Sequence, residues 1–198
     1  MISLSVVIIT FNEEKNIVRC LDTVKTLADE IIVVDSFSTD STRSLCEKAG
    51  VRFIEHKFEG FTKQKQFAVA QAASDYILAL HADEYLSVDL AESIKSAKNN
   101  WKADGYSMNR LNSYAGKWIK SCGWYPDIKI RLWNRRKGNW GGGLVHETVV
   151  MEEGSKISHL DGDLLHHAYD NASQLIQKMQ QQYADLFARE HAEKKPVT

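Results

Sequence analysis

A chain of 198 residues has the length of one domain, and a hydrophobic content of 43% is enough to bury a core. The formal net charge of −1 excludes the basic imbalance typical of proteins that bind nucleic acid by neutralising phosphates. The first apolar run is too short for a signal peptide, and no run of about 18 apolar residues occurs, so we expect a cytoplasmic chain without a membrane span.

Strand-like and helix-like segments alternate through the first 100 residues. β-Branched apolar runs predict strands at residues 4–10, 30–35, 51–54 and 76–80. Periodic or capped segments predict helices at residues 14–26, 41–49, 63–73 and 88–99. This order predicts an α/β fold, with a mostly parallel sheet, right-handed crossovers and helices on both faces.

The pattern changes after residue 100. Residues 104–111 and 128–134 are typical of strands, and an aromatic, glycine-rich stretch separates them. The run from Gly141 to Gly143 indicates a flexible break. A long polar helix is expected over residues 171–193, with one stripe formed by Leu175, Met179, Tyr183 and Leu186.

Polar and acidic residues follow the predicted strands, where α/β sheets bind their ligands. Asp83 comes directly after the fourth strand and is placed to hold a hard divalent cation, although a solvated turn or a helix cap would use the same residue type. The adjacent Glu84 need not reach the same ion, because consecutive side chains diverge. Asp35 ends the second strand and could accept hydrogen bonds from a base or a ribose.

Three weaker signals lie in the second half. Glu147 follows the glycine run and could serve as a general base, although exposed glutamates are common. The pair His166–His167 indicates either metal ligation or histidines that are satisfied in the core or cap a helix. Several aromatic and arginine side chains could stack on sugars and hold phosphates, or could form a core under a long loop: Trp118, Trp124, Tyr125, Trp133, Arg131, Arg135 and Arg136.

Three segments together resemble the family 2 glycosyltransferases, which have the GT-A fold, a Rossmann-like, mixed, mostly parallel sheet flanked by helices. They are SVVIITFNE at residues 5–13, VVDSFSTDST at residues 33–42 and HADE at residues 81–84. The chain is most similar to the branch of lipopolysaccharide core β-1,4-glucosyltransferase-like proteins, in which Asp-Ala-Asp-Glu stands where this chain has HADE. That branch also has counterparts of Gly123–Asp127 followed by Arg131 and Leu132, of His146–Glu147 and of His166–Tyr169.

The resemblance implies roles for individual residues. Within a single domain, residues 1–100 would bind the nucleotide sugar, residues 101–170 would carry the acceptor and catalytic half, and residues 171–198 would form the C-terminal helix. Asp83, with His166, would contact Mg²⁺ or Mn²⁺, and Glu147 would be the base. The nucleotide-sugar contacts would come from Thr10, Asn12, Glu13, Asp35, Lys65, His81, Ala82 and Asp83, and the acceptor or phosphate contacts from Trp124, Asp127 and Arg131.

The reaction implied is a single inverting displacement that moves a hexose, with glucose expected, from a UDP-sugar to a glycan or lipid-linked saccharide. The acceptor would belong to lipopolysaccharide core or cell-surface polysaccharide, and the enzyme could contact the inner face of the cytoplasmic membrane peripherally. A nucleotidyltransferase is the first alternative, but it should carry a glycine-rich basic loop where this chain has TFNEE. The second is a catalytically weak nucleotide-sugar-binding relative, because His81 replaces the first aspartate of the motif.

Overall fold

The computed structural model describes residues 1–142 and 147–178. Its first half alternates strands and helices: β1 (Leu4–Thr10), α1 (Ile17–Val24), β2 (Glu30–Asp35), α2 (Thr42–Lys48), β3 (Arg52–Glu55), α3 (Phe61–Ala70) and β4 (Tyr76–His81). The strands of this half pair in the order β3-β2-β1-β4, and every pairing is parallel. The sequence predicted these four strands and three helices, and the structure confirms them with shifts of up to three residues at their ends.

The second half extends the same sheet. It comprises β5 (Glu84–Leu86), α4 (Val88–Asn99), β6 (Gly105–Tyr114), β7 (Lys117–Trp118), β8 (Asp127–Asn134), β9 (Gly138–Gly142), β10 (Glu147–Met151), β11 (Ile157–Tyr169) and α5 (Ala172–Lys178). From β4 the order continues β8-β6-β11-β5, and β7 pairs with β6. β8 is antiparallel to β4 and β6, whereas β11 is parallel to β6 and antiparallel to β5. The predicted α/β class with a mixed sheet and flanking helices is therefore confirmed.

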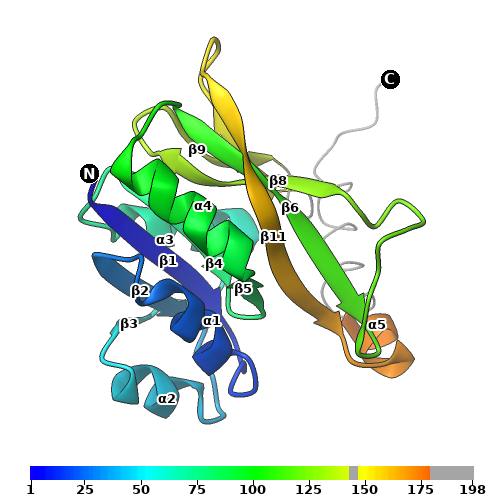
Figure 1. Cartoon of the computed structure of the whole chain (residues 1–198). Helices are drawn as coiled ribbons and strands as arrows, with labels where there is room; N and C mark the ends of the chain where they lie inside the picture. The colour runs from blue at the N-terminus through cyan, green and yellow to red at the C-terminus, as the bar shows by residue number, and fades with distance from the viewer. Residues whose placement is uncertain (143–146, 179–198) are drawn as a thin grey trace, which may run out of the picture.

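Alternation along the strands creates two apolar layers. Val6 and Ile8 lie in the larger core cluster, whereas Val7 between them lies in the smaller one. α1 packs into the larger cluster because its apolar residues recur three or four positions apart, and α4 joins it there. α3, β9 and β10 cover the opposite face, so that Figure 1 shows α4 in front of the sheet and α3 behind it.

One expectation for the second half was wrong, and another, the helix over residues 171–193, is tested only over residues 172–178, where α5 agrees with it. Gly141 and Gly142 lie in β9, which pairs with β10, so the predicted flexible break is wrong for these two residues. A Cβ on Gly141 would come within 2.9 Å of Val150 Cγ2, which shows that this glycine permits close strand packing. Gly143 lies outside the described residues, as do Met179, Tyr183 and Leu186 of the predicted long helix.

The sheet brings the carboxyl ends of β1, β2 and β4 to one edge. Thr10 pairs with Asp35, and Ile9 pairs with His81. This edge is where a parallel sheet is expected to bind its ligand. Within the described residues, no helix has both the length and the apolar character that a bilayer crossing requires.

Candidate active site

The loops after β1 and β2 are joined by hydrogen bonds. The backbone N–H of Asn12 donates to Ser38 Oγ at 2.7 Å, and the side-chain oxygen of Asn12 accepts from the Thr39 backbone N–H at 2.8 Å. Asn12 has a φ of 52°, a conformation that asparagine tolerates better than most residues. The Glu13 backbone N–H donates to Thr42 Oγ1 at 2.9 Å. The two loops therefore form one surface.

The buried carboxylate of Asp35 holds the loop after β2 in place. It is 1% exposed, and Ser38 donates both its backbone N–H, at 2.6 Å, and its hydroxyl to it. The neighbouring Thr10 Oγ1 is buried and has no hydrogen-bond partner within residues 1–142 and 147–178. Direct contact of either residue with a nucleotide stays a prediction, but an orphaned hydroxyl at a strand end is a polar group that a ligand can satisfy.

Asp83 and His166 face one another across the turn that follows β4. Oδ2 of Asp83 lies 3.3 Å from Nε2 of His166. The other ring nitrogen, Nδ1, contacts Oδ1 of Asn112 at 2.6 Å, and the Asn112 amide nitrogen donates to the Trp124 carbonyl. This fixes Nδ1 as the donor, and in the neutral ring it leaves the lone pair of Nε2 directed at a carboxylate.

Such an arrangement fits a divalent cation. A carboxylate oxygen from a turn and an imidazole nitrogen from a neighbouring strand are ligands that Mn²⁺ or Mg²⁺ accepts, and a hydrogen-bonded second nitrogen is what metal-ligating histidines usually have. Among the described residues, no group of three or more potential metal-binding side chains occurs. Asp83 and His166 would thus supply two ligands, and a bound diphosphate or water would complete the set.

Lys65 and Glu147 form a second charged pair on the α3 side. The ammonium of Lys65 lies 2.6 Å from Oε1 of Glu147, and the side chains are 4% and 14% exposed. The same ammonium lies over the ring of Trp140, 4.4 Å from its centroid. Burial and the nearby Arg131 lower the pKa of Lys65 to about 8, although Glu147 opposes them.

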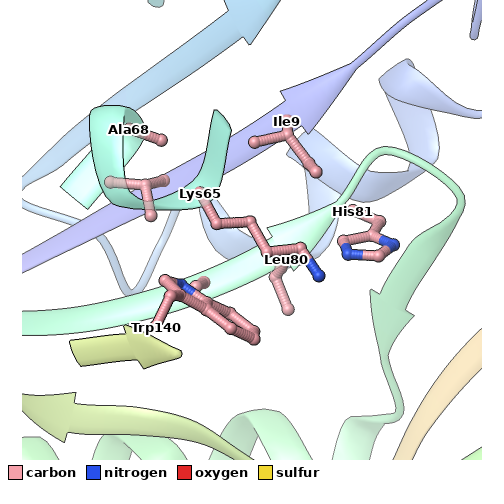
Figure 2. A pocket seen from close by; sticks show the side chains of 8 residues that line it. Ile9, Lys65, Ala68, Leu80, His81 and Trp140 are labelled. Atoms are coloured by element: carbon pink, nitrogen blue, oxygen red, sulfur yellow. The ribbon is translucent and has the colours of Figure 1, made fainter. Parts of the chain in front are cut away.

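His81 points toward Lys65 in a small pocket. Figure 2 shows the ammonium of Lys65 and the ring of His81 turned toward one another, with Trp140 and Ile9 beside them. Burial, and then the charge of Lys65, hold the pKa of His81 well below its ordinary value, so the ring is neutral at pH 7. Its Nε2 has no hydrogen-bond partner among the described residues.

Glu84 is a charged residue of the site to which the sequence assigned no role beyond its place next to Asp83. It has no exposed surface, and its Oε1 accepts from Arg131 at 2.8 Å and lies 3.5 Å from an Arg110 nitrogen. Burial raises the pKa of Glu84, but the charges of Arg131 and Arg110 outweigh it and hold the pKa well below its ordinary value. The only sequence signal was its place beside Asp83, because its partners are distant in the chain.

The family model described as glycosyl transferase family 2 matches residues 5–153. An uncharacterised glycosyltransferase of Rickettsia typhi is 32% identical over 203 residues, which is 97% of this chain and 68% of that protein. Residues 5–153, which the family model matches, include Lys65, Glu147 and Asp83 but not His166.

The chain belongs to glycosyl transferase family 2. Its relatives include the lipopolysaccharide core biosynthesis glycosyltransferase LpsC of Rhizobium meliloti, which is 32% identical over 175 residues, or 82% of this chain and 62% of LpsC. The structure of S. aureus TarS 1-349 in complex with UDP matches with a TM-score of 0.58 and 17% identity, over 95% of this chain and 65% of TarS 1-349. This similarity supports the GT-A fold. Family membership also argues against the nucleotidyltransferase alternative.

The two histidines of the predicted pair lie in different surroundings. His166 faces Asp83, whereas His167 hydrogen-bonds to Arg19 and stacks on Tyr85 with ring centroids 5.5 Å apart. Only His166 therefore lies at the candidate metal site. His146, which the resemblance pairs with Glu147, lies outside the described residues. Ala82 is 2% exposed and donates its backbone N–H to the Ile9 carbonyl at 3.2 Å, so it anchors the turn to β1.

The predicted acceptor residues are not one exposed cluster. Asp127 pairs with Arg110 at 2.7 Å and with Lys129 at 2.8 Å, and Trp124 is half-buried. Arg131 is 3% exposed and pairs with Glu84, so its predicted contact with an acceptor or phosphate remains untested. Trp133 is fully buried and packs edge-on against Trp140. For Trp133 the alternative of a core residue is the one that holds.

Proposed function

We propose that this family 2 glycosyltransferase transfers a hexose from a UDP-sugar to a hydroxyl of a glycan acceptor, with inversion at the anomeric carbon. The observation that carries the proposal is the carboxylate of Asp83 lying 3.3 Å from Nε2 of His166 at the ligand-binding edge of the sheet. Residues 1–100 would bind the donor, and residues 101–170 would bind the acceptor. Similarity to LpsC supports an acceptor in lipopolysaccharide core, and glucose is the hexose we expect.

The loops after β1 and β2 would receive the uridine. The orphaned hydroxyl of Thr10, the Asn12 and Glu13 loop and the carboxylate of Asp35 surround the position where the base and ribose would lie. Carboxylate oxygens can each accept more than one hydrogen bond, so Asp35 can bind a uracil N–H while retaining Ser38. His81 would offer its unpartnered Nε2 to the donor in place of the family's first aspartate.

Asp83 and His166 would hold Mg²⁺ or Mn²⁺, which when bound would neutralise charge on the departing diphosphate. Glu147 would accept the proton of the acceptor hydroxyl as its oxygen forms a bond to the anomeric carbon, while the bond from that carbon to UDP breaks. A single displacement inverts the anomeric carbon and needs no nucleophilic side chain. Lys65, the ion-pair partner of Glu147, would donate to the diphosphate.

A titration with UDP tests the proposal. Calorimetry with and without Mn²⁺ should show binding that depends on the cation, and Asp83→Ala should abolish that dependence because it removes the carboxylate ligand. Asp22→Ala, which changes an exposed carboxylate on α1, is the matched control and should bind as the wild type does. Binding of UDP that ignores Mn²⁺ and is unchanged in Asp83→Ala would overturn the assignment.

The cellular setting is a further part of the proposal. If the acceptor is lipid-linked, the enzyme would work in the cytoplasm at the inner face of the cytoplasmic membrane. Association with vesicles made of anionic lipid, measured by co-sedimentation, tests a peripheral contact directly.

A further inference from the structure

Glu84 closes the turn that carries Asp83. Its Oε2 accepts the backbone N–H of His81 at 3.0 Å, so the side chain reaches back across His81, Ala82 and Asp83. Two further bonds fix the backbone of the turn, because Ala82 donates to the Ile9 carbonyl and His167 donates to the Asp83 carbonyl. The turn is therefore held by β1, by β11 and by its own glutamate.

The other oxygen of Glu84 connects this turn to the antiparallel half of the sheet. Arg131 on β8 donates to Oε1 at 2.8 Å, and Arg110 on β6 lies 3.5 Å from the same atom. Glu84 and Arg131 are 0% and 3% exposed, so water competes little for this pair. Both oxygens of one carboxylate are thus committed to fixed partners on different strands.

Burying the charges of Glu84 and Arg131 has a large desolvation cost. A buried ion pair often stabilises a fold no more than well-packed apolar residues of the same volume would, because desolvation offsets the attraction. What the pair does provide is position, since a charge with no access to water tolerates little displacement from its partners. Glu84 bonds directly to the His81 N–H and to Arg131, and Asp83, which faces His166, lies in the turn between His81 and Glu84.

We infer that Glu84 is a positioning residue, which through the His81 N–H and Arg131 holds the Asp83 carboxylate beside His166 in the arrangement that receives the cation. The inference rests on the proposed function, because it concerns the same cation and diphosphate. Glu84 itself does not touch the ligand, and its effect is transmitted through the turn. Substitution of a residue that supports a metal ligand without binding the metal itself typically changes metal affinity by about 10- to 100-fold.

Glu84→Gln tests the inference with almost no change of volume. A glutamine can accept from His81 or from Arg131 through its one oxygen, but its amide group presents hydrogens to the other donor. Mn²⁺ affinity, measured calorimetrically in the presence of saturating UDP, should fall about tenfold. UDP affinity without metal should fall by a smaller factor than Mn²⁺ affinity, because the bonds of Glu84 described above go to His81, Arg131 and Arg110 and not to the loops after β1 and β2. Glu92→Gln on the exposed face of α4 is the control and should alter neither value.

Mn²⁺ affinity and melting temperature, measured on the same variant, distinguish a positioning role from general support of the fold. A purely structural role for Glu84 would lower the melting temperature of Glu84→Gln and leave the Mn²⁺ affinity of the folded protein unchanged, which would overturn the inference. If the wild type itself fails to bind Mn²⁺ with UDP, the proposed function fails instead.

Glu84→Asp keeps the inference testable if Glu84→Gln does not fold. It retains the charge beside Arg131 but is one methylene too short to reach both Arg131 and the His81 N–H. We expect it to fold and to show weakened Mn²⁺ binding with nearly unchanged metal-free UDP binding. Wild-type Mn²⁺ affinity in folded Glu84→Asp would contradict the inference.

Discussion

The ammonium of Lys65 and the carboxylate of Glu147 lie 2.6 Å apart, although the two residues are 82 positions apart in the chain. Lys65 comes from α3 in the first half of the chain, and Glu147 is the first residue of β10 in the second half. The pair thus joins a predicted donor-binding residue to the predicted base. Before any donor binds, the carboxylate that is proposed to take the acceptor proton is already held by a buried cation.

Removing the ammonium of Lys65 should destabilise the protein. Lys65→Met leaves Glu147 mostly buried without its partner, and we expect the free energy of unfolding to fall by about 2–3 kcal/mol. Lys95→Met is the control, because Lys95 forms an exposed pair with Glu92 and should change stability by less than about 0.5 kcal/mol. Urea denaturation of both variants measures the difference. Equal stabilities would show that the Lys65 pair contributes nothing.

The depressed pKa of Lys65 predicts a pH dependence. The folded group has a pKa of about 8 and the unfolded group keeps 10.5, so between these values the unfolded chain binds more protons and stability rises with pH. The cost of burying the ammonium is fully present below pH 8 and is relieved toward pH 10.5. The stability of the wild type relative to Lys65→Met should therefore increase from pH 7.5 to pH 10, by at most about 1.4 kcal/mol per pH unit. A difference that is flat or falls over this range would refute the shift.

Glu147→Gln should separate binding from chemistry. The amide oxygen can still accept from Lys65, so UDP affinity should remain, but the side chain can no longer take a proton. Transfer from a UDP-hexose, followed by release of UDP, should fall between about 10²- and 10⁴-fold. Glu152→Gln, an exposed change just beyond β10, should leave the rate unchanged. Full activity in Glu147→Gln would remove this residue from the mechanism.

Two glycines with positive φ should respond differently to alanine. Gly162 on β11 has a φ of 96°, and a Cβ there would lie 2.3 Å from the backbone nitrogen of Leu90 on α4. Gly154 has a φ of 78° and open space around it. Gly154→Ala should cost about 1 kcal/mol of stability for backbone strain, and Gly162→Ala at least about 3 kcal/mol because α4 must move as well. Thermal unfolding of the two variants checks this, and similar losses would contradict the close approach of α4 and β11.

The parallel half could be predicted because its signals are local. Each apolar run, such as residues 4–10 or 30–35, is enough by itself to predict a strand. The alternation of these strands with helices then predicts parallel pairing. The strands β5, β7, β9, β10 and β11 were missed, and for β5, β9 and β11 the reason is the opposite one. β5 has three residues, β9 contains three glycines, and β11 alternates histidine, aspartate and glycine with leucine, so none shows a clear apolar period.

By itself, the sequence determined the α/β class, the parallel strands and the family, together with the polar residues that follow β1, β2 and β4. Only the tertiary structure decided which side chains meet: Asp83 with His166, Lys65 with Glu147, and Glu84 with Arg131. Local composition states whether a segment can be a strand or a helix, because that depends on residues a few positions apart. Contacts between charged groups on distant strands depend on the order and register of the whole sheet, and a buried charge can be recognised only once its surroundings are known.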